Sequence, residues 1–333
     1  MALTEEGLVH VPGLHSRYVR LQSGVKAHYS TSGETGPDVI LLHGGIPGSS
    51  GAAGFRHMAP FLGAHGFRVH APDMPNFGLT EDPFGRYNYG KGAAVDFLHE
   101  FAEAIGLDTF HIGGNSMGCL NAVNYTVAHP ERVRSFALIA GHIGDLVTRA
   151  EMLAANRGRK SEEVAATKVS SGYDGTAADM RRILENVTLD PAAVTDDVVE
   201  MRTAAAALHK DTYGPNMKRF LDETDPLDQV RLTTRGRLDV LDIPGIYVFG
   251  MEDSMYAPEA ANLQEDALPK VQFFYPEDAG HQGQSDRPDL FNQLFLEFFR
   301  DGRVSWETAT AGGVSQRRAP LPHLVEVPTH AEV

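Results

Sequence analysis

A serine flanked by glycines stands where an apolar segment gives way to a helical one. The motif reads Gly114-Asn115-Ser116-Met117-Gly118 and follows a short strand-like run. The glycines permit a sharp turn that leaves the serine hydroxyl exposed at the start of the next helix. At that point the helix dipole and the free backbone N–H groups favour an anionic intermediate. The pattern therefore predicts Ser116 as a nucleophile.

A serine nucleophile needs a base, and the base needs a carboxylate that orients it. His281 follows the last strand-like run of the sequence, and Asp253 follows the run before it. Glu252 is the neighbour of Asp253, and Asp145 follows an earlier run, so both are alternative acids. We predict a catalytic triad of Ser116, His281 and Asp253.

A glycine-rich loop, His43-Gly44-Gly45-Ile46-Pro47-Gly48, follows another strand-like run. Its glycines allow backbone N–H groups to face a substrate oxygen, so Gly45 and Met117 are the predicted oxyanion-hole donors. The alternative interpretation is an ordinary connection between a strand and a helix. His43 belongs to this loop and His111 lies inside a strand-like run, where a hydrogen-bonded core histidine is expected.

The elements that position these residues follow an alternating order. An alternating pattern at 17–21 and 25–29 predicts an antiparallel hairpin. Continuous apolar runs, typical of strands buried on both faces of a parallel sheet, follow it at 39–42, 67–71, 110–114, 136–140, 246–250 and 271–275. Helical spacing appears between runs, at 93–105 and 117–128. The order predicts an α/β fold with a mostly parallel sheet and catalytic residues at the carboxyl ends of its strands.

The alternation stops between residues 144 and 231, which are alanine-rich and show helical segments at 162–168, 177–185 and 196–208. We predict a helical cap inserted after the sixth strand. The expected organisation is a core in two parts, 1–143 and 232–301, with the cap at 144–231 and a tail at 302–333. The tail holds Trp306 and is expected either to wrap around the core or to be disordered.

Composition excludes several classes of function. The 333 residues carry 29 Lys and Arg against 44 Asp and Glu, and the net charge of −15 disfavours nucleic acid and anionic membranes. The single cysteine, Cys119, excludes a disulfide framework and is expected to be a small buried residue. No phosphate-binding loop, dinucleotide motif or metal-ligand spacing is present, so no cofactor or metal is expected. The lack of a secretory signal and of a long apolar stretch predicts a cytoplasmic protein.

These motifs resemble the α/β-hydrolase superfamily over about residues 20–300, and within it the meta-cleavage product hydrolases, which are serine enzymes that cleave carbon–carbon bonds. The likeness lies in the serine motif, the glycine-rich loop, the spacing of Asp253, His281 and Gln284, and the segments 184–190 and 194–202. It implies a ring-fission product of aromatic degradation, of the 2-hydroxy-6-oxo-dienoate type, as substrate. Arg202 matches the cap arginine that engages the dienoate carboxylate in that family.

The resemblance also implies that Asn115, Gly44, Ile46 and Gln282 contact the substrate. The sequence departs from the family at three positions near the carboxylate or carbonyl end of the pocket. Ile46 replaces a loop glycine, Gly54 replaces an asparagine, and Gln282 replaces a tryptophan. These departures leave the catalytic core untouched and bear on the substrate.

Other functions stay open at this point. A carboxylesterase or lactonase acting on an aromatic or acyl ester would use the same catalytic residues. A receptor-like protein could keep the fold to bind a ligand, and cofactor-free oxygen chemistry would need His281 but not Ser116. The expected partner is a small molecule, anionic or aromatic, and the resemblance favours a homo-oligomer with an even number of subunits.

Overall fold

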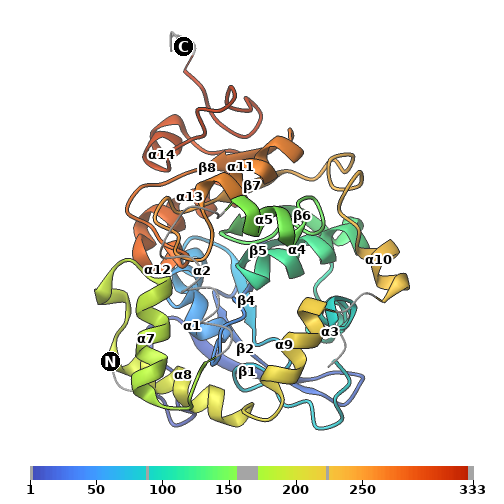
Figure 1. Cartoon of the computed structure of the whole chain (residues 1–333), viewed down its shortest axis with the longest axis vertical. Coiled ribbons are helices and arrows are strands. Elements are labelled where there is room, and N and C mark those ends of the chain that lie inside the picture. Colours follow the sequence, from blue (N-terminus) through green and yellow to red (C-terminus); the bar gives the residue numbers. More distant parts are fainter. Residues whose placement is uncertain (1–2, 88–89, 156–171, 223–224, 329–333) are drawn as a thin grey trace.

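The computed structural model describes residues 3–87, 90–155, 172–222 and 225–328. Within these residues the centre is an eight-stranded sheet of order β1-β2-β4-β3-β5-β6-β7-β8 (Figure 1). The strands are β1 (His15–Arg20), β2 (Lys26–Ser32), β3 (Asp38–Leu42), β4 (Arg68–Pro72), β5 (Phe110–Asn115), β6 (Val133–Ile139), β7 (Gly245–Val248) and β8 (Val271–Phe274). β2 pairs antiparallel with β1 and β4, and the remaining pairs are parallel. The predicted α/β fold, with its N-terminal hairpin, is confirmed.

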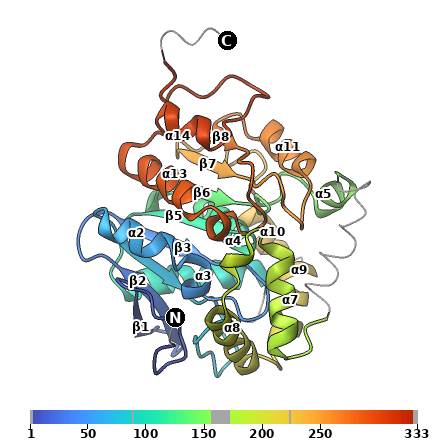
Figure 2. The same cartoon turned by 90° about the vertical axis from the view of Figure 1, so that its left-hand side faces the viewer.

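Helices cover both faces of the sheet, which is why the central strands are continuous apolar runs. The helices of the core are α1 (Gly51–Phe55), α2 (Met58–Ala64), α3 (Gly90–Ala104), α4 (Met117–Ala128), α11 (Pro258–Ala267), α12 (Gly283–Asp286) and α13 (Pro288–Asp301). α2 packs with α13, and α3 packs with α4 on the opposite face (Figures 1 and 2). Every residue of β3 and β5 is buried, so the carboxyl ends of these strands are held rigidly.

The chain between β6 and β7 is helical in its described part, as predicted for the insertion after the sixth strand. It forms α5 (Arg149–Ala155), α7 (Ala177–Val187), α8 (Asp196–Leu208), α9 (Tyr213–Asp222) and α10 (Pro226–Leu232). The helices predicted at 177–185 and 196–208 are α7 and α8, whereas α9 and α10 were not predicted. The helix predicted at 162–168 lies outside the described residues.

The inserted helices have an apolar core of their own that reaches the glycine-rich loop. Met180 and Ile183 of α7 and Val198 of α8 are buried in one cluster together with Ile46 and Ala52. α7 and α8 lie side by side at one end of the molecule (Figures 1 and 2). The insertion is therefore packed against the part of the core that carries the predicted oxyanion loop.

The last segment wraps around the core as far as residue 328. It forms α14 (Trp306–Ala311) and bridges β8 through Val314. Val304, Ala309 and Leu324 are fully buried. The described part of this segment therefore packs on the core through apolar side chains that are spaced irregularly along it.

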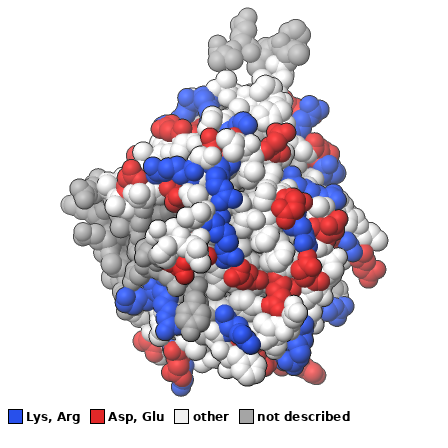
Figure 3. Space-filling view, turned by 90° about the vertical axis from the view of Figure 1, so that its right-hand side faces the viewer, with Lys and Arg blue, Asp and Glu red and all other residues white. Residues whose placement is uncertain are grey.

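The surface of the molecule carries charges of both signs. Lys and Arg are interspersed with Asp and Glu over the face seen in Figure 3. Across the described ranges, no helix combines the length and the hydropathy needed to cross a bilayer.

Candidate active site

The serine motif forms a strained turn between β5 and α4. Ser116 has φ 56° and ψ −116°, in a region that non-glycine residues rarely adopt. A Cβ on Gly114 would lie 2.2 Å from the carbonyl oxygen of Gly118, and one on Gly118 would lie 2.0 Å from that of Leu42. Both positions therefore require glycine, and the turn leaves Ser116 partly exposed at the N-terminus of α4.

The three residues predicted as a triad come together in a continuous chain of hydrogen bonds. His281 Nε2 lies 2.8 Å from Ser116 Oγ, and His281 Nδ1 lies 2.8 Å from Asp253 Oδ2. The other carboxylate oxygen of Asp253 accepts the backbone N–H groups of Met255 and Tyr256 at 2.6 and 3.0 Å. Asp253 is 2% exposed and His281 is 3% exposed. This geometry leaves Nε2 free to accept the serine proton while the carboxylate orients the ring.

The alternative acids are engaged elsewhere. Asp145 accepts hydrogen bonds from Thr233 and from the backbone and hydroxyl of Thr234 at 2.6–2.7 Å. Burial raises its pKa, but these hydrogen bonds outweigh burial and lower it to about 2. Glu252 accepts the backbone N–H of Ala279 at 3.2 Å. Asp253 is the acid that contacts His281.

The glycine-rich loop approaches the residue after the serine. A Cβ on Gly45 would lie 3.0 Å from Met117 Sδ, and one on Gly44 would lie 3.4 Å from Ser116 Cβ. His43 fixes the start of the loop, because its Nδ1 donates to the carbonyl of Gly44 at 2.7 Å and its Nε2 accepts the N–H of Met74 at 3.0 Å. Burial lowers the pKa of His43, which agrees with this neutral tautomer. The two residues predicted to supply the oxyanion donors, Gly45 and Met117, are therefore in contact.

Arg202 projects from α8 into the protein beside this loop. It is 2% exposed, and its Nη1 donates to Ser49 Oγ at 3.2 Å. Its Nε has no acceptor in the described part of the chain, and no carboxylate there pairs with it. Burial, and then the neighbouring charge of Arg56, lower the pKa of Arg202 to about 9. The guanidinium therefore stays charged at neutral pH, and its charge is uncompensated within the described residues.

The other residues expected to contact substrate lie around the same loop, and one of them is already engaged. Asn115 is 3% exposed, and its amide nitrogen donates to the carbonyl of Ile139 at 3.2 Å and to that of His281 at 2.9 Å. Both hydrogens of this amide are therefore used, which ties the histidine loop to β5. Ile46 packs into the apolar cluster of α7 and α8, and Gln282 is buried at 6% exposure.

Gly54, the position at which the resemblance implies an asparagine, lies against the start of the loop. A Cβ there would be 3.4 Å from His43 Cβ, and the carbonyl of Gly54 accepts Gln284 Nε2 at 3.4 Å. Cys119 is fully buried, and burial raises its pKa to about 12, as expected for a packing residue. His111 donates to or accepts from Ser135 Oγ at 2.8 Å inside the core, and burial lowers its pKa to about 4.

Sequence reasoning missed three residues that hold the site together. Asp73 accepts the N–H groups of Gly51 and Leu79 at 2.7 and 2.8 Å, so it fixes the helix that follows the glycine-rich loop. Asp286 accepts the N–H of Gly280 at 2.8 Å, next to His281, and also those of Leu189 and Asp190 after α7. Tyr213 of α9 donates to the carbonyl of Gly45 at 2.8 Å. Asp73 follows a strand-like run directly, and this position could have identified it as a residue of the site. Asp286 and Tyr213 have no such feature in the sequence.

Within the described ranges, no group of three or more His, Cys, Asp or Glu side chains is placed to hold a metal ion. The hydrogen-bond chain of the triad supports nucleophilic attack by Ser116 and proton transfer through His281, with backbone N–H groups available to stabilise an oxyanion.

Comparison with known proteins gives consistent matches over most of the chain. The family described as "alpha/beta hydrolase fold" matches residues 38–288. The 2-hydroxy-6-oxononadienedioate/2-hydroxy-6-oxononatrienedioate hydrolase 1 of Dechloromonas aromatica is 26% identical over 289 residues, which cover 85% of this chain and 94% of the relative. An enzyme of the same name from Comamonas testosteroni is 27% identical over 284 residues, covering 84% and 93%. The solved structure of the meta-cleavage product hydrolase CumD from Pseudomonas fluorescens IP01 superposes with a TM-score of 0.67 at 26% identity, covering 86% of this chain and 98% of that one.

Proposed function

Because the chain belongs to the alpha/beta hydrolase fold family, we propose that it is a serine hydrolase that cleaves a carbon–carbon bond in a ring-fission product of aromatic degradation. The substrate is of the 2-hydroxy-6-oxo-dienoate type, the class named for its relatives. The observation that carries the proposal is the buried, uncompensated charge of Arg202 beside the glycine-rich loop. An esterase acting on neutral esters has no use for such a charge, whereas a dienoate brings a carboxylate to it.

The first half-reaction uses the hydrogen-bond chain of the triad. His281 takes the proton of Ser116 as the hydroxyl attacks the ketone at the distal end of the substrate, and Asp253 stabilises the imidazolium. The oxyanion lies between the N–H groups of Gly45 and Met117, each of which lowers the barrier by about 3 kcal/mol if it behaves as a typical donor.

Bond cleavage needs an electron sink on the leaving side. Ketonisation of the dienol supplies it, since the electrons of the broken carbon–carbon bond then pass into a conjugated ketone and leave as a dienolate. Arg202 holds the carboxylate of this fragment through charge-assisted hydrogen bonds. The dienolate takes the proton of the His281 imidazolium and leaves as a dienol. Water then attacks the acyl-enzyme, His281 accepts its proton and returns one to Ser116, and the second product is a carboxylic acid.

Other residues of the site position these groups. Asn115 holds the backbone of His281, and Asp286 joins the same loop to the segment after α7. Gly44, Ile46 and Gln282 border the substrate on the carboxylate side. The reaction needs no cofactor, and the cytoplasmic location and even-numbered assembly expected from the sequence complete the proposal.

The test compares wild type with Ser116→Ala and Arg202→Ala on a ring-fission dienoate and on an activated aryl ester. Dienoate absorbance and phenol release report the two reactions. We expect dienoate cleavage that is lost in Ser116→Ala and strongly reduced in Arg202→Ala, while Arg202→Ala keeps ester turnover. Ester hydrolysis without dienoate cleavage would identify an esterase or lactonase instead. Tight dienoate binding without turnover of either compound would identify a receptor.

A further inference from the structure

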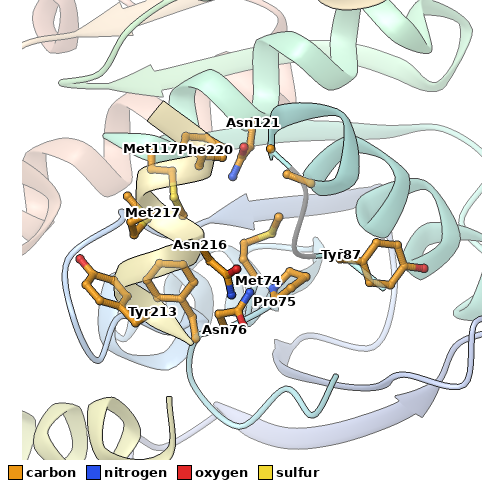
Figure 4. Close-up of a pocket in the computed structure, with 13 residues that line it drawn as sticks. Met74, Pro75, Asn76, Tyr87, Met117, Asn121, Tyr213, Asn216, Met217 and Phe220 are labelled. Atoms are coloured by element: carbon orange, nitrogen blue, oxygen red, sulfur yellow. The ribbon is translucent and has the colours of Figure 1, made fainter. Parts of the chain in front are cut away.

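A cavity lies beside Met117, the residue that follows the nucleophile in the chain. It is bounded by α9, by the loop after β4 and by the first turns of α4, and Figure 4 shows the side chains that line it. Most are apolar or aromatic, among them Met74, Met217 and Phe220. Among the described lining residues none carries a charge. The cavity therefore suits an uncharged group.

One polar side chain in this cavity lacks the partners that burial requires. Asn121, on α4, is 1% exposed, and neither its amide nitrogen nor its amide oxygen has a hydrogen-bond partner within the described residues. In Figure 4 the amide lies beside the cavity, across from Met74. A buried amide without partners is costly, and such groups in native proteins call for an explanation such as a ligand.

Two methionine side chains lie between the cavity and the oxyanion loop. A Cβ on Gly45 would lie 3.0 Å from Met117 Sδ and 3.3 Å from Met217 Cε. Tyr213, which also lines the cavity, donates to the carbonyl of Gly45 at 2.8 Å. Unbranched thioether side chains adapt easily to a neighbouring group. The cavity therefore begins behind the two methionines that contact Gly45, and a rotation of these side chains would open it to an acyl group held there.

We propose that this cavity is the acyl subsite, and that Asn121 selects substrates whose acyl group is uncharged and ends in a group that both donates and accepts a hydrogen bond. A carboxamide or a hydroxyl satisfies both halves of the Asn121 amide. A carboxylate finds no cation among the described lining residues and would face the amide oxygen with a like partial charge. The names of the relatives denote dioates, which carry a second carboxylate. This chain is thus specific for a different distal group, an inference that rests on the proposed acyl transfer at Ser116.

Three phenyl esters with acyl groups of nearly equal shape test this directly: phenyl succinamate, phenyl hemisuccinate and phenyl 4-methylpentanoate. They end in a carboxamide, a carboxylate and an apolar branch. For wild type we expect kcat/KM for the succinamate to exceed that for the hemisuccinate by about 100-fold or more, because the carboxylate loses its hydration and no described lining residue offers it a cation. Asn121→Leu should lower the ratio of succinamate to 4-methylpentanoate by at least about tenfold.

Asn124→Leu is the matched control, because Asn124 is a buried asparagine on the same helix that lies outside this cavity. It should keep the wild-type ratios. Met217→Lys places a cation in the cavity and should raise kcat/KM for the hemisuccinate at least tenfold, which keeps the inference testable if Asn121→Leu folds poorly.

Equal rates for the hemisuccinate and the succinamate in wild type would overturn the inference, as would ratios in Asn121→Leu that match those in Asn124→Leu. Absence of any hydrolysis dependent on Ser116 would overturn it as well. The esters report on this cavity whether or not dienoates are cleaved. If the enzyme cleaves dienoates but shows no selectivity among the esters, only the inference about this cavity is wrong. If it shows the ester selectivity but cleaves no dienoate, only the proposed carbon–carbon reaction is wrong.

Discussion

Replacement of Arg202 by methionine should leave the free protein as stable as before, or more stable, while it damages catalysis. The pKa of the guanidinium lies at about 9 instead of 12.5. A difference of that size corresponds to about 5 kcal/mol of unfavourable free energy for the charged form. Methionine removes this cost and loses one hydrogen bond to Ser49, which contributes about 1 kcal/mol. Some packing of the guanidinium is lost too, so we expect a free energy of unfolding between unchanged and about 2 kcal/mol higher.

The effect on the reaction has the opposite sign. Loss of one partner from a buried, hydrogen-bonded charge pair costs about 2–4 kcal/mol, so kcat/KM for a dienoate should fall about 30- to 1,000-fold. A neutral aryl ester does not bring a carboxylate to this position, and its kcat/KM should change less than about threefold. Urea unfolding followed by circular dichroism gives the first quantity, and steady-state kinetics on the two substrates gives the second.

Arg202→Lys serves as the control that keeps the charge but loses the planar fork of the guanidinium. It should retain part of the dienoate activity and none of the gain in stability. The reasoning is refuted if Arg202→Met unfolds at clearly lower urea concentration and cleaves the dienoate at the wild-type rate. That pair of results would make Arg202 a structural residue whose charge is balanced in some other way.

Three further predictions concern the triad, the buried histidines and the cysteine. Asp253→Asn should lower kcat about 10³- to 10⁴-fold on dienoate and ester alike, because the orienting carboxylate of His281 is lost; a loss below tenfold would assign that task to another residue. Burial lowers the pKa of His57 and of His111 to about 4, whereas a histidine of the unfolded chain has a pKa of 6.5. Below pH 6.5 the unfolded chain therefore binds more protons than the folded protein. Each of these two histidines should lower the free energy of unfolding by about 2 kcal/mol between pH 7 and pH 5, and His57→Gln should reduce the fall by up to that amount. A fall that His57→Gln leaves unchanged would contradict this. Cys119, with its pKa at about 12, should react with iodoacetamide at pH 8 only after unfolding, as mass spectrometry can show, and rapid labelling of the native protein would contradict its burial.

The sequence by itself determined the sheet and the place of the chemistry. Continuous apolar runs such as that of β3 have no polar face, so they require layers of helix on both sides. Gly114 of the serine motif is required locally, because a Cβ there would collide with the carbonyl of Gly118 in the same turn. The apolar runs and the glycine of the turn each depend on a few neighbouring residues, so both can be recognised from the sequence without knowledge of the fold.

Only the tertiary structure decided which partners those residues have. Asp145 and Asp253 both follow strands, and their roles differ because Thr233 and Thr234 surround one carboxylate while His281 reaches the other. The same holds for the helices: α9 and α10 escaped prediction, yet α9 carries Tyr213 to the oxyanion loop.

The burial of Arg202 and the unpartnered amide of Asn121 show most clearly what the sequence alone does not reveal. The helical pattern alone places both residues among polar positions typical of a solvated face, and only the family resemblance indicated a role for Arg202. In the fold, α8 packs against the glycine-rich loop and the second turn of α4 faces a cavity under α9. A side chain's solvation depends on which elements cover it, and that is set by contacts between segments far apart in the chain. The sequence therefore determined where a nucleophile would stand, and the packing of the inserted helices decided what charge and shape of substrate it meets.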